Sequence, residues 1–358
     1  MRAGRTGTLA RRGGITPGER GNYLATIGDV AREAGVSRST VSSVLTGRKF
    51  VSPETREKIE AAITQLGYSV NAGARALATA RTMTLGVVVR FHEAEFSPAL
   101  ATYLVALADA ARESGYAVVL LTEPDGEAAV RKAIAGRQVD GLVLLSVVEG
   151  DPRLGPIAES GYPAVLVGMP EDARGIDSVD LDFAAAARLL VDHLADNGHR
   201  EATFVRWPDE VYAAGSTYAI RFSSAAVQRA GKRDMRLEPL SCSVGPEQVR
   251  AALRDELGRA DGPRALIVHN DAASAMLPFA LHDTGLDVPE NRSVVSLHSA
   301  ELARLYALPF TSVESGPDVV AHAAIEMLVR RIDSPDAPAE ARLVGPRLIE
   351  RGSVATVA

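Results

Sequence analysis

The chain has few of the residues that cross-link proteins or bind metals. A single cysteine, Cys242, occurs in 358 residues, which excludes an intramolecular disulfide. The seven histidines are scattered and never reach the short ligand spacings of a zinc site. We therefore expect a protein of a reducing compartment, the cytoplasm, that holds no metal and needs no cofactor.

Long apolar runs and enzyme motifs are also missing from the sequence. No stretch approaches the roughly 20 apolar residues that span a bilayer, and the N-terminal arginines lack the apolar segment of a signal peptide. We find no G-x-G-x-x-G after the first expected strand, no phosphate-binding Gly-Lys-Ser/Thr loop and no G-x-S-x-G. We expect a soluble, non-exported protein that is not an enzyme.

Charge is distributed unevenly along the chain. The net charge is -6, yet residues 1–81 contain thirteen Arg or Lys and six acidic residues, a net +7, so that the remainder carries -13. A basic head on an acidic body indicates that the head alone meets a polyanion such as DNA, because phosphate repels the body. A solvated basic tail would have the same composition, so charge alone leaves both readings open.

Three short helices are expected near the N-terminus, after an arm over 1–24 that is rich in Gly and Arg, shows no periodicity and is expected to be disordered. Each helix has a hydroxyl residue at its N-cap and a glycine at its end. The N-caps are Thr26, Ser37 and Ser52, and the terminating glycines are Gly35, Gly47 and Gly67. Together they predict a miniature three-helix domain over 25–70.

The rest of the chain alternates buried strands with helices. The expected strands are 84–90, 117–121, 140–146, 163–168, 202–206, 264–269 and 293–297, and the expected helices are 99–114, 126–136, 183–197, 216–230, 246–259 and 272–284. This alternation predicts parallel, doubly wound sheets with helices on both faces. Because the segment is too long for one such unit, we expect two lobes with a ligand cleft at the strand ends.

The second helix has an unusual number of hydroxyl groups. VSRSTVSSVLTG, residues 36–47, contains six Ser or Thr, and its apolar Val41, Val44 and Leu45 share one face. After the tight turn at Gly35, this helix is expected to enter the DNA major groove, where Arg38 can bind guanine in a fork. The alternatives are a merely solvated polar face or a protein-docking module.

A connector, NAGARALATARTM, joins the three helices to the body over 71–83. It contains helix-forming residues but is too short to persist alone as a helix in water. It could fold on binding DNA, with Leu77 wedged between base pairs from the minor groove. The alternative is that Leu77 packs on the lobe beneath it.

These segments resemble the LacI/GalR (lactose-repressor) family of bacterial transcription regulators. TIGDVAREAGVSRSTVSSVLTG, VSPETREKIEAAITQLGY and NAGARAL follow the family's DNA-binding motif almost position by position. Further family segments are GHR at 198–200, HND at 269–271, GLDVPENRSVVS at 285–296, LPFTSVE at 308–314 and LIERGS at 348–353. The resemblance implies an all-α helix-turn-helix head and an α/β body of the two-lobed, periplasmic-binding-protein-like kind.

The resemblance also implies what the parts do. A homodimer would bind a pseudo-palindromic operator in double-stranded DNA, act as a repressor at the nucleoid, and respond to a small-molecule effector in the interlobe cleft. Base contacts fall to Arg38, Ser39 and Ser43, phosphate contacts to Ser37, Thr40 and Ser42, and minor-groove hinge roles to Asn71, Ala74, Arg75 and Leu77; Thr26 completes the expected DNA-binding set. Dimer contacts are expected near 99–114 and 272–284.

The body departs from the family pattern in the effector cleft. The family's Arg-x-x-Gly motif falls on Ala219, with Arg221 two residues out of phase, and its carboxylate after the last core strand is replaced by His298. The expected effector residues are Phe96, Asp182, Arg206, Trp207, Arg221, Asn270 and His298. We therefore expect that generic monosaccharides are not the effectors.

Several readings of the cleft remain open. Arg206, Arg221 and a titratable His298 favour an anionic ligand, whereas a cleft closed by Trp207 would leave a protein partner or no effector. Asp182 and Asn270 are equally consistent with helix caps. The two lobes are expected over 84–175 plus 309–334 (N-lobe) and over 176–308 plus 335–354 (C-lobe). A stand-alone solute-binding protein, the alternative to a regulator, would have the same two lobes.

Overall fold

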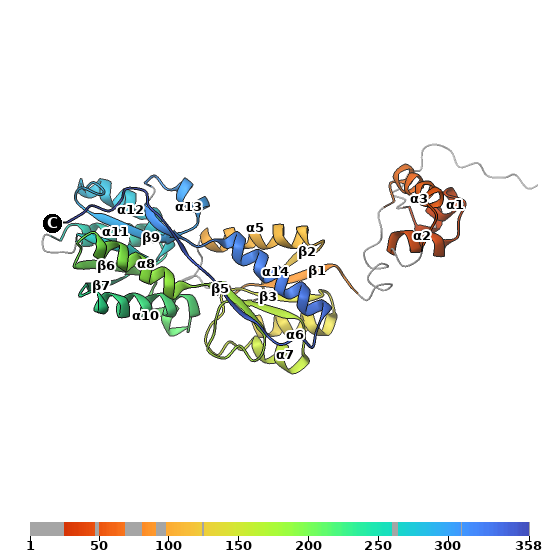
Figure 1. Cartoon of the computed structure of the whole chain (residues 1–358), viewed down its shortest axis with the longest axis horizontal. Coiled ribbons are helices and arrows are strands. Elements are labelled where there is room, and N and C mark those ends of the chain that lie inside the picture. The colour runs from red at the N-terminus through yellow and green to blue at the C-terminus, as the bar shows by residue number, and fades with distance from the viewer. Residues whose placement is uncertain are drawn as a thin grey trace, which may run out of the picture. The chain divides into compact units, whose positions relative to one another are not determined.

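The computed structural model separates the chain into two compact units, 1–82 and 83–358 (Figure 1). It describes residues 25–46, 50–68, 81–90, 98–123, 125–259, 264–308 and 310–357. The expected arm over 1–24 and most of the expected connector lie outside the described residues.

The first unit is the predicted three-helix head. Its helices are α1 (Ile27–Glu33), α2 (Arg38–Thr46) and α3 (Pro53–Leu66). The Thr26 hydroxyl accepts the Asp29 N–H at 3.4 Å, and the Asp29 carboxylate accepts the Thr26 N–H at 2.9 Å, which closes a capping box. Ser37 Oγ accepts the Thr40 N–H at 3.1 Å, and Ser52 caps α3. The three expected N-caps are thus confirmed.

The head has a small apolar core of its own. Its buried members come from all three helices: Val30, Ala31, Val41, Val44, Ile59 and Ala62. Between α1 and α2, Gly35 adopts a φ of 66°, where side chains are strained, and the Val36 N–H donates to the Ala31 carbonyl at 2.9 Å. This tight turn holds the buried face of α2 against α1.

The second unit contains two six-stranded sheets, here called the N-lobe and the C-lobe. The N-lobe sheet has the order β11-β5-β4-β3-β1-β2 and all its pairs are parallel. Its strands are β1 (Thr84–Val88), β2 (Ala117–Leu121), β3 (Gly141–Leu144), β4 (Ala164–Val167), β5 (Asp177–Leu181) and β11 (Ala341–Val344). The helices around it are α5 (Pro98–Glu113), α6 (Gly126–Gly136), α7 (Leu154–Ser160) and α14 (Pro317–Asp333).

The C-lobe sheet has the order β12-β10-β9-β8-β6-β7, with β12 antiparallel at one edge. Its strands are β6 (Glu201–Arg206), β7 (Arg236–Ser241), β8 (Ala265–Val268), β9 (Ser293–His298), β10 (Thr311–Glu314) and β12 (Arg347–Ile349). Its helices are α8 (Phe183–Asp196), α9 (Asp209–Ala213), α10 (Thr217–Lys232), α11 (Pro246–Leu257), α12 (Asp271–Thr284) and α13 (Ala300–Leu305). The predicted fold class, a helical head with doubly wound parallel sheets, is confirmed.

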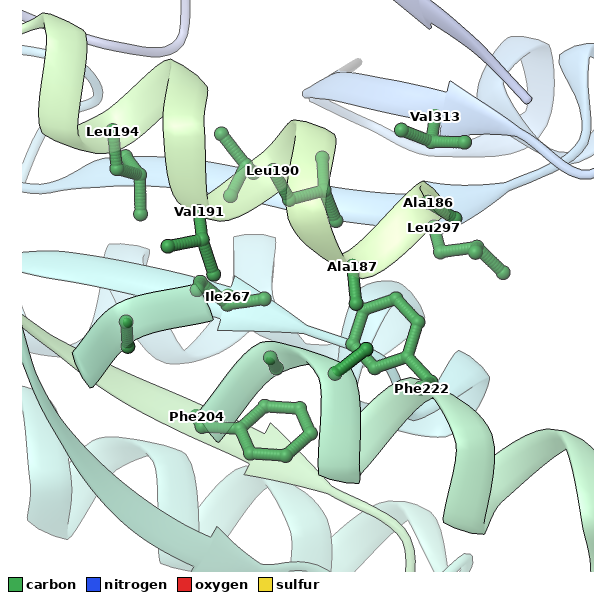
Figure 2. Close-up of a cluster of buried hydrophobic side chains, with 14 of the residues drawn as sticks. Ala186, Ala187, Leu190, Val191, Leu194, Phe204, Phe222, Ile267, Leu297 and Val313 are labelled. Atoms are coloured by element: carbon green, nitrogen blue, oxygen red, sulfur yellow. The ribbon is translucent and has the colours of Figure 1, made fainter. Parts of the chain in front are cut away.

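Each sheet is covered on both faces by helices, so each lobe has two apolar cores. In the C-lobe, α8 and α10 pack on one face, where Leu190 and Val191 lie over Ile267 and Phe222 comes close to Ala187 (Figure 2). Helices α11 and α12 cover the other face. Burial on both faces explains why the central strands are almost continuously apolar.

The expected lobe boundaries are wrong in three places. β5 and β11, expected in the C-lobe, pair with each other in the N-lobe sheet, whereas β10, expected in the N-lobe, lies in the C-lobe sheet. The chain therefore crosses between lobes after β5, after β10 and after β11. The error arose because these strands are short and, in β5, polar, so that they were not recognised as strands. None of the described helices is long and apolar enough to cross a membrane.

Candidate nucleic-acid interface and ligand cleft

Helix α2 presents its polar face outward. Val41 is fully buried and Val44 is 9% exposed, while Arg38 and Ser39 at the start of the helix are exposed. Ser43 is half-buried, and its hydroxyl donates to the Ser39 carbonyl at 2.9 Å. The short side chains leave the first turns of α2 thin, so that backbone and hydroxyls can approach a base edge closely.

The hydroxyls at the start of α2 form a connected group. Ser37 Oγ lies 2.7 Å from Ser39 Oγ and 2.8 Å from Thr40 Oγ1. The Ser37 oxygen also caps the helix, whose N-terminal N–H groups favour an anion. A phosphate oxygen placed here would meet both hydroxyls and the positive end of the helix.

Arg38 lies next to α1. A Cβ added to Gly28 would come within 2.7 Å of Arg38 Nη2, so the guanidinium rests against the backbone of α1. No ion pair joins Arg38 to a carboxylate of the described residues. Arg38 is an exposed residue at the start of α2, the position from which a recognition helix reads bases.

The structure brings together one part of the expected DNA-binding set. Thr26, Ser37, Arg38, Ser39, Thr40, Ser42 and Ser43 all lie on or at the start of α1 and α2. Thr26 is engaged in its capping box. Asn71, Ala74, Arg75 and Leu77 lie outside the described residues, so their hinge role stays a prediction.

A cleft opens between the lobes at the carboxyl ends of the strands of both sheets. Its empty volume is about 860 Å³, part of which is open to solvent. The lining residues are Ala99, Leu100, Tyr103, Leu145, Ser146, Val147, Val167, Gly168, Asp180, Phe183, Trp207, Thr217, Tyr218, His269, Asp271, Leu297, His298 and Ser315. Trp207 therefore does not fill the cleft.

Direct bonds join the two lobes beside the cleft. Arg221 of α10 donates from Nη1 to Asp180 Oδ2 in β5 at 2.7 Å, and from Nη2 to the Leu181 carbonyl at 2.9 Å. Thr217 Oγ1 donates to the Val147 carbonyl at 3.1 Å. Burial raises the pKa of Asp180 to about 6, although the charge of Arg221 opposes the shift.

A buried ion pair supports the N-lobe wall. Arg153 and Asp151 are almost fully buried, with Nη2 and Oδ2 2.6 Å apart, and Arg153 also donates to the Ser146 carbonyl at 3.1 Å. Burial works to raise the pKa of Asp151, but the hydrogen bonds and charge of Arg153 outweigh it and leave that pKa lowered. The pair anchors the turn where Ser146, at φ 51°, enters the cleft lining.

Four rings form the C-lobe wall. Phe183 and Tyr218 have centroids 5.7 Å apart, Trp207 and Tyr218 meet edge to face at 5.9 Å, and His269 lies 6.0 Å from Tyr218. Beneath them, Phe222 stacks on the His269 ring at 3.9 Å. Edge-to-face pairs fix ring orientations, so the wall has one defined shape.

The two cleft histidines are neutral. Burial lowers the pKa of His269 to about 3, and burial together with the charge of Arg351 lowers that of His298 to about 4. His298 Nδ1 lies 2.8 Å from Ser296 Oγ. Three buried ring nitrogens, Trp207 Nε1, His269 Nδ1 and His298 Nε2, have no hydrogen-bond partner among the described residues. Such atoms call for a ligand or water.

The expected effector residues separate into two groups. Trp207 and His298 line the cleft. The other five do not appear in its lining: Arg206 pairs with Asp209, Arg221 with Asp180, Asp182 caps α8, Asn270 caps α12, and Phe96 lies outside the described residues. For Asp182 and Asn270 the structure supports the cap reading.

Other lining residues were missed in the sequence. His269 and Asp271 flank Asn270 in the HND segment, of which only Asn270 was an expected effector residue. His269 ends the predicted strand 264–269, and Asp271 follows Asn270 directly after it. Asp180 lies in a strand that was not recognised. Tyr103, Thr217 and Tyr218 are helical residues whose facing toward a cleft depends on tertiary packing. Among the described residues, no group of three or more His, Cys, Asp or Glu is arranged to hold a metal ion.

Comparison with known proteins identifies related sequences. Residues 26–71 match a model for bacterial regulatory proteins of the lacI family, and 191–354 match a periplasmic binding protein-like domain. The HTH-type transcriptional regulator CelR of Thermobifida fusca is 32% identical, over 85% of this chain and 90% of its own. The ribose operon repressor of Escherichia coli strain K12 is 31% identical, over 92% and 100%.

A similar fold is found in a solved structure of the lac repressor dimer bound to operator and the anti-inducer ONPF. The TM-score is 0.77 at 23% identity, covering 93% of this chain and 100% of that one. At this identity the likeness concerns the fold. Head and body are thus arranged along the chain in the same order as in these relatives.

Proposed function

Because the chain belongs to the lacI family of bacterial regulatory proteins, we propose that it represses transcription by binding a pseudo-palindromic operator as a homodimer. It is a DNA-binding transcriptional regulator and not an enzyme. Its place of action is the cytoplasm, at the nucleoid, where its DNA partner lies.

The observation that carries this proposal is the exposed start of α2. Arg38 and Ser39 face solvent while Val41 of the same helix is fully buried in the head core. With α2 in the major groove, Arg38, Ser39 and Ser43 read bases, and Ser37, Thr40 and Ser42 lie near phosphates. Asn71, Ala74, Arg75 and Leu77 act in the minor groove, with Leu77 at a central base step.

Dimerisation is supported by exposed apolar side chains on the two helices expected to form the interface. Val105 of α5 is 63% exposed and Phe279 of α12 is 48% exposed. Apolar side chains of this size are commonly covered in obligate interfaces. If α5 of the N-lobe and α12 of the C-lobe each contact the other protomer, the two heads of the dimer would be held at a set spacing. A movement of the two lobes relative to each other would change that spacing.

The cleft is the effector site of this proposal. Bonds such as Arg221–Asp180 and Thr217–Val147 join the lobes at its edge, so a ligand that changes lobe closure has direct contacts to remake. A ligand alters operator affinity only by its differential affinity for the two lobe arrangements, commonly about 1 to 3 kcal/mol. The empty volume of the cleft favours a small molecule over a protein partner.

Selection of bound duplexes from a random pool tests the DNA function. We expect one pseudo-palindromic site, whose two halves reflect the two heads of the dimer. If each half neutralises about four phosphates, log K should fall with log salt at a slope of about -7. Binding with no preference over random competitor at low ionic strength, or an affinity that salt leaves unchanged, would contradict the proposal.

A further inference from the structure

The lining of the cleft has a chemistry that suits one class of ligand. We propose that the cleft binds a small arylalkylammonium cation, a planar aromatic ring with one protonated amino group on a short alkyl chain, in preference to a polyol or an anion. This inference rests on the proposed function, because it takes the cleft to be the effector site. Three observations support it separately: the aromatic wall of the cleft, the charge of its lining, and the unpartnered nitrogens of His269 and His298.

The ring wall favours a planar, mostly apolar ligand. Tyr218 and His269 contact each other and both Phe183 and Trp207, at centroid distances of 5.7 to 6.4 Å. Six of the other lining residues are aliphatic: Ala99, Leu100, Leu145, Val147, Val167 and Leu297. A ring placed against this wall extends the existing aromatic contacts, whereas the hydroxyls of a polyol would find few partners on these aromatic and aliphatic side chains.

The charge of the cleft disfavours an anion. No Lys or Arg occurs among the described lining residues, whereas two carboxylates do: Asp271, and Asp180, whose charge Arg221 balances. The flanking cations are already paired, Arg221 with Asp180 at 2.7 Å and Arg206 with Asp209. Arg351, whose charge lowers the pKa of His298, also has a carboxylate partner, because its Nη2 lies 3.7 Å from Glu314 Oε1.

Carboxylates dominate the field inside the cleft. Burial and the charges of Asp180, Asp271 and Asp318 all raise the pKa of Tyr103, because each disfavours a phenolate. Burial and Asp271 raise the pKa of Tyr306 in the same way. A negative field that disfavours an anion on Tyr103 stabilises a cation held at the same place, and the ring faces add cation–π attraction.

The histidines supply acceptors for an ammonium group. His269 and His298 are 2% and 1% exposed, and a neutral imidazole presents one acceptor nitrogen. His269 Nδ1 and His298 Nε2 have no partner among the described residues although both side chains line the cleft. In the tautomer that carries its proton on the other ring nitrogen, each of these nitrogens accepts an ammonium N–H, which satisfies a buried polar atom that a hydrocarbon ligand would leave unpaired.

Trp207 provides the measurement, because it is the single tryptophan of the chain and lines the cleft. Its emission in the full-length protein is followed during titration with phenethylamine, 2-phenylethanol and phenylacetate, which share a ring and differ in charge, and with D-glucose. We expect saturable changes with affinity in the order amine, alcohol, acid. The amine should bind at least about tenfold more tightly than the acid, and glucose should have no effect.

Asp271→Asn tests the origin of the preference, since it removes the charge and keeps the shape. The amine-to-acid affinity ratio should fall several-fold, whereas Asp287→Asn, an exposed carboxylate outside the lining, should leave it unchanged. Should Asp271→Asn fail to fold, the four-probe series on the unmodified protein still decides the proposal.

The proposal is overturned if phenylacetate binds as tightly as phenethylamine, if glucose binds and the ring compounds do not, or if no probe changes the emission. Specific DNA binding of the same preparation is measured in parallel. Failure of the ring series with intact DNA specificity rejects the ligand class alone, whereas loss of DNA specificity rejects the proposed function itself.

Discussion

The head and the cleft carry their functional side chains in opposite ways. In the head, the candidate contacts between Ser37 and Ser43 are close together in the chain, lie on one helix or at its N-cap, and are exposed or half-buried, while Val41 between them is buried. In the cleft, Tyr103, Trp207 and His298 come from three distant segments, and Trp207 and His298 are almost fully buried. The DNA-binding surface can be formed by residues on one face of a single helix, whereas the ligand pocket is formed by residues that only the tertiary fold brings together.

The strongest test of this contrast destroys one region and spares the other. Val41→Asp places an unpaired charge in the head core and should cost at least about 3 kcal/mol, enough to unfold so small a domain. DNA binding should be lost, while the main thermal transition of the body stays unchanged. Ala61→Asp, on the exposed side of α3, is the matched control and should retain binding.

The buried ion pair between Arg153 and Asp151, beside the cleft, should contribute more to the free energy of unfolding than an exposed charge on the head. Arg153→Met leaves Asp151 buried without its partner and should lower the free energy of unfolding by about 3 to 5 kcal/mol. The double variant with Asp151→Asn should recover part of the loss, measured by urea denaturation. If the loss of unfolding free energy in the double variant equals the sum of the losses in the two single variants, Arg153 and Asp151 are not coupled.

Acid should lower the free energy of unfolding, because the two cleft histidines are neutral in the folded protein and become protonated on unfolding. Because the folded-state pKa of His298 is lowered to about 4, its contribution to stability is complete above about pH 6.5 and is lost as the pH falls toward 4. His269 acts in the same direction, whereas the raised pKa of Asp180, about 6, makes Asp180 act in the opposite direction.

Unfolding free energies between pH 4 and 7 measure this effect. His298→Gln should reduce the pH slope of stability by about 1.4 kcal/mol per pH unit relative to the unmodified protein. His322→Gln is the control, because His322 is exposed and its pKa is raised by the Asp318 carbonyl and Glu113. Equal slopes in His298→Gln and the unmodified protein would show that His298 is not held neutral by folding.

In the head, a single exposed side chain should change specificity without changing stability. Arg38→Ala should relax base preference at one position of each half-site by about 1 to 3 kcal/mol, because it removes the proposed fork to guanine. Repeating the selection of duplexes with the variant reports the lost position. A uniform loss across all duplexes would assign Arg38 to phosphate instead.

The smallest effect is expected at the helix caps, which are alike in both regions. Asp182→Ala in the body and Ser52→Ala in the head should each cost about 1 kcal/mol of stability, because each removes an N-cap acceptor. Neither should alter which ligand the cleft prefers. A changed ring-probe affinity in Asp182→Ala would return Asp182 to the effector residues.

Local sequence was sufficient for the head and the central strands of the body. The caps Thr26, Ser37 and Ser52 and the buried positions Val41 and Ile59 follow from spacing alone, since both depend on residues a few positions apart. Local sequence was not sufficient to predict the edge strands of the two sheets or the points where the chain crosses between lobes. β7 contains Pro239, which reads as a break but is tolerated at the sheet edge.

By itself the sequence determined the helix-turn-helix head and the alternating body, because these depend on neighbouring or motif-spaced residues. Tertiary structure decided which lobe β5 joins and what faces the cleft. The segment DSVDL is polar, yet all of it is buried because Asp177 pairs with Arg331 and Asp180 with Arg221, both distant in the chain. Burial of a charge depends on a partner that only folding supplies.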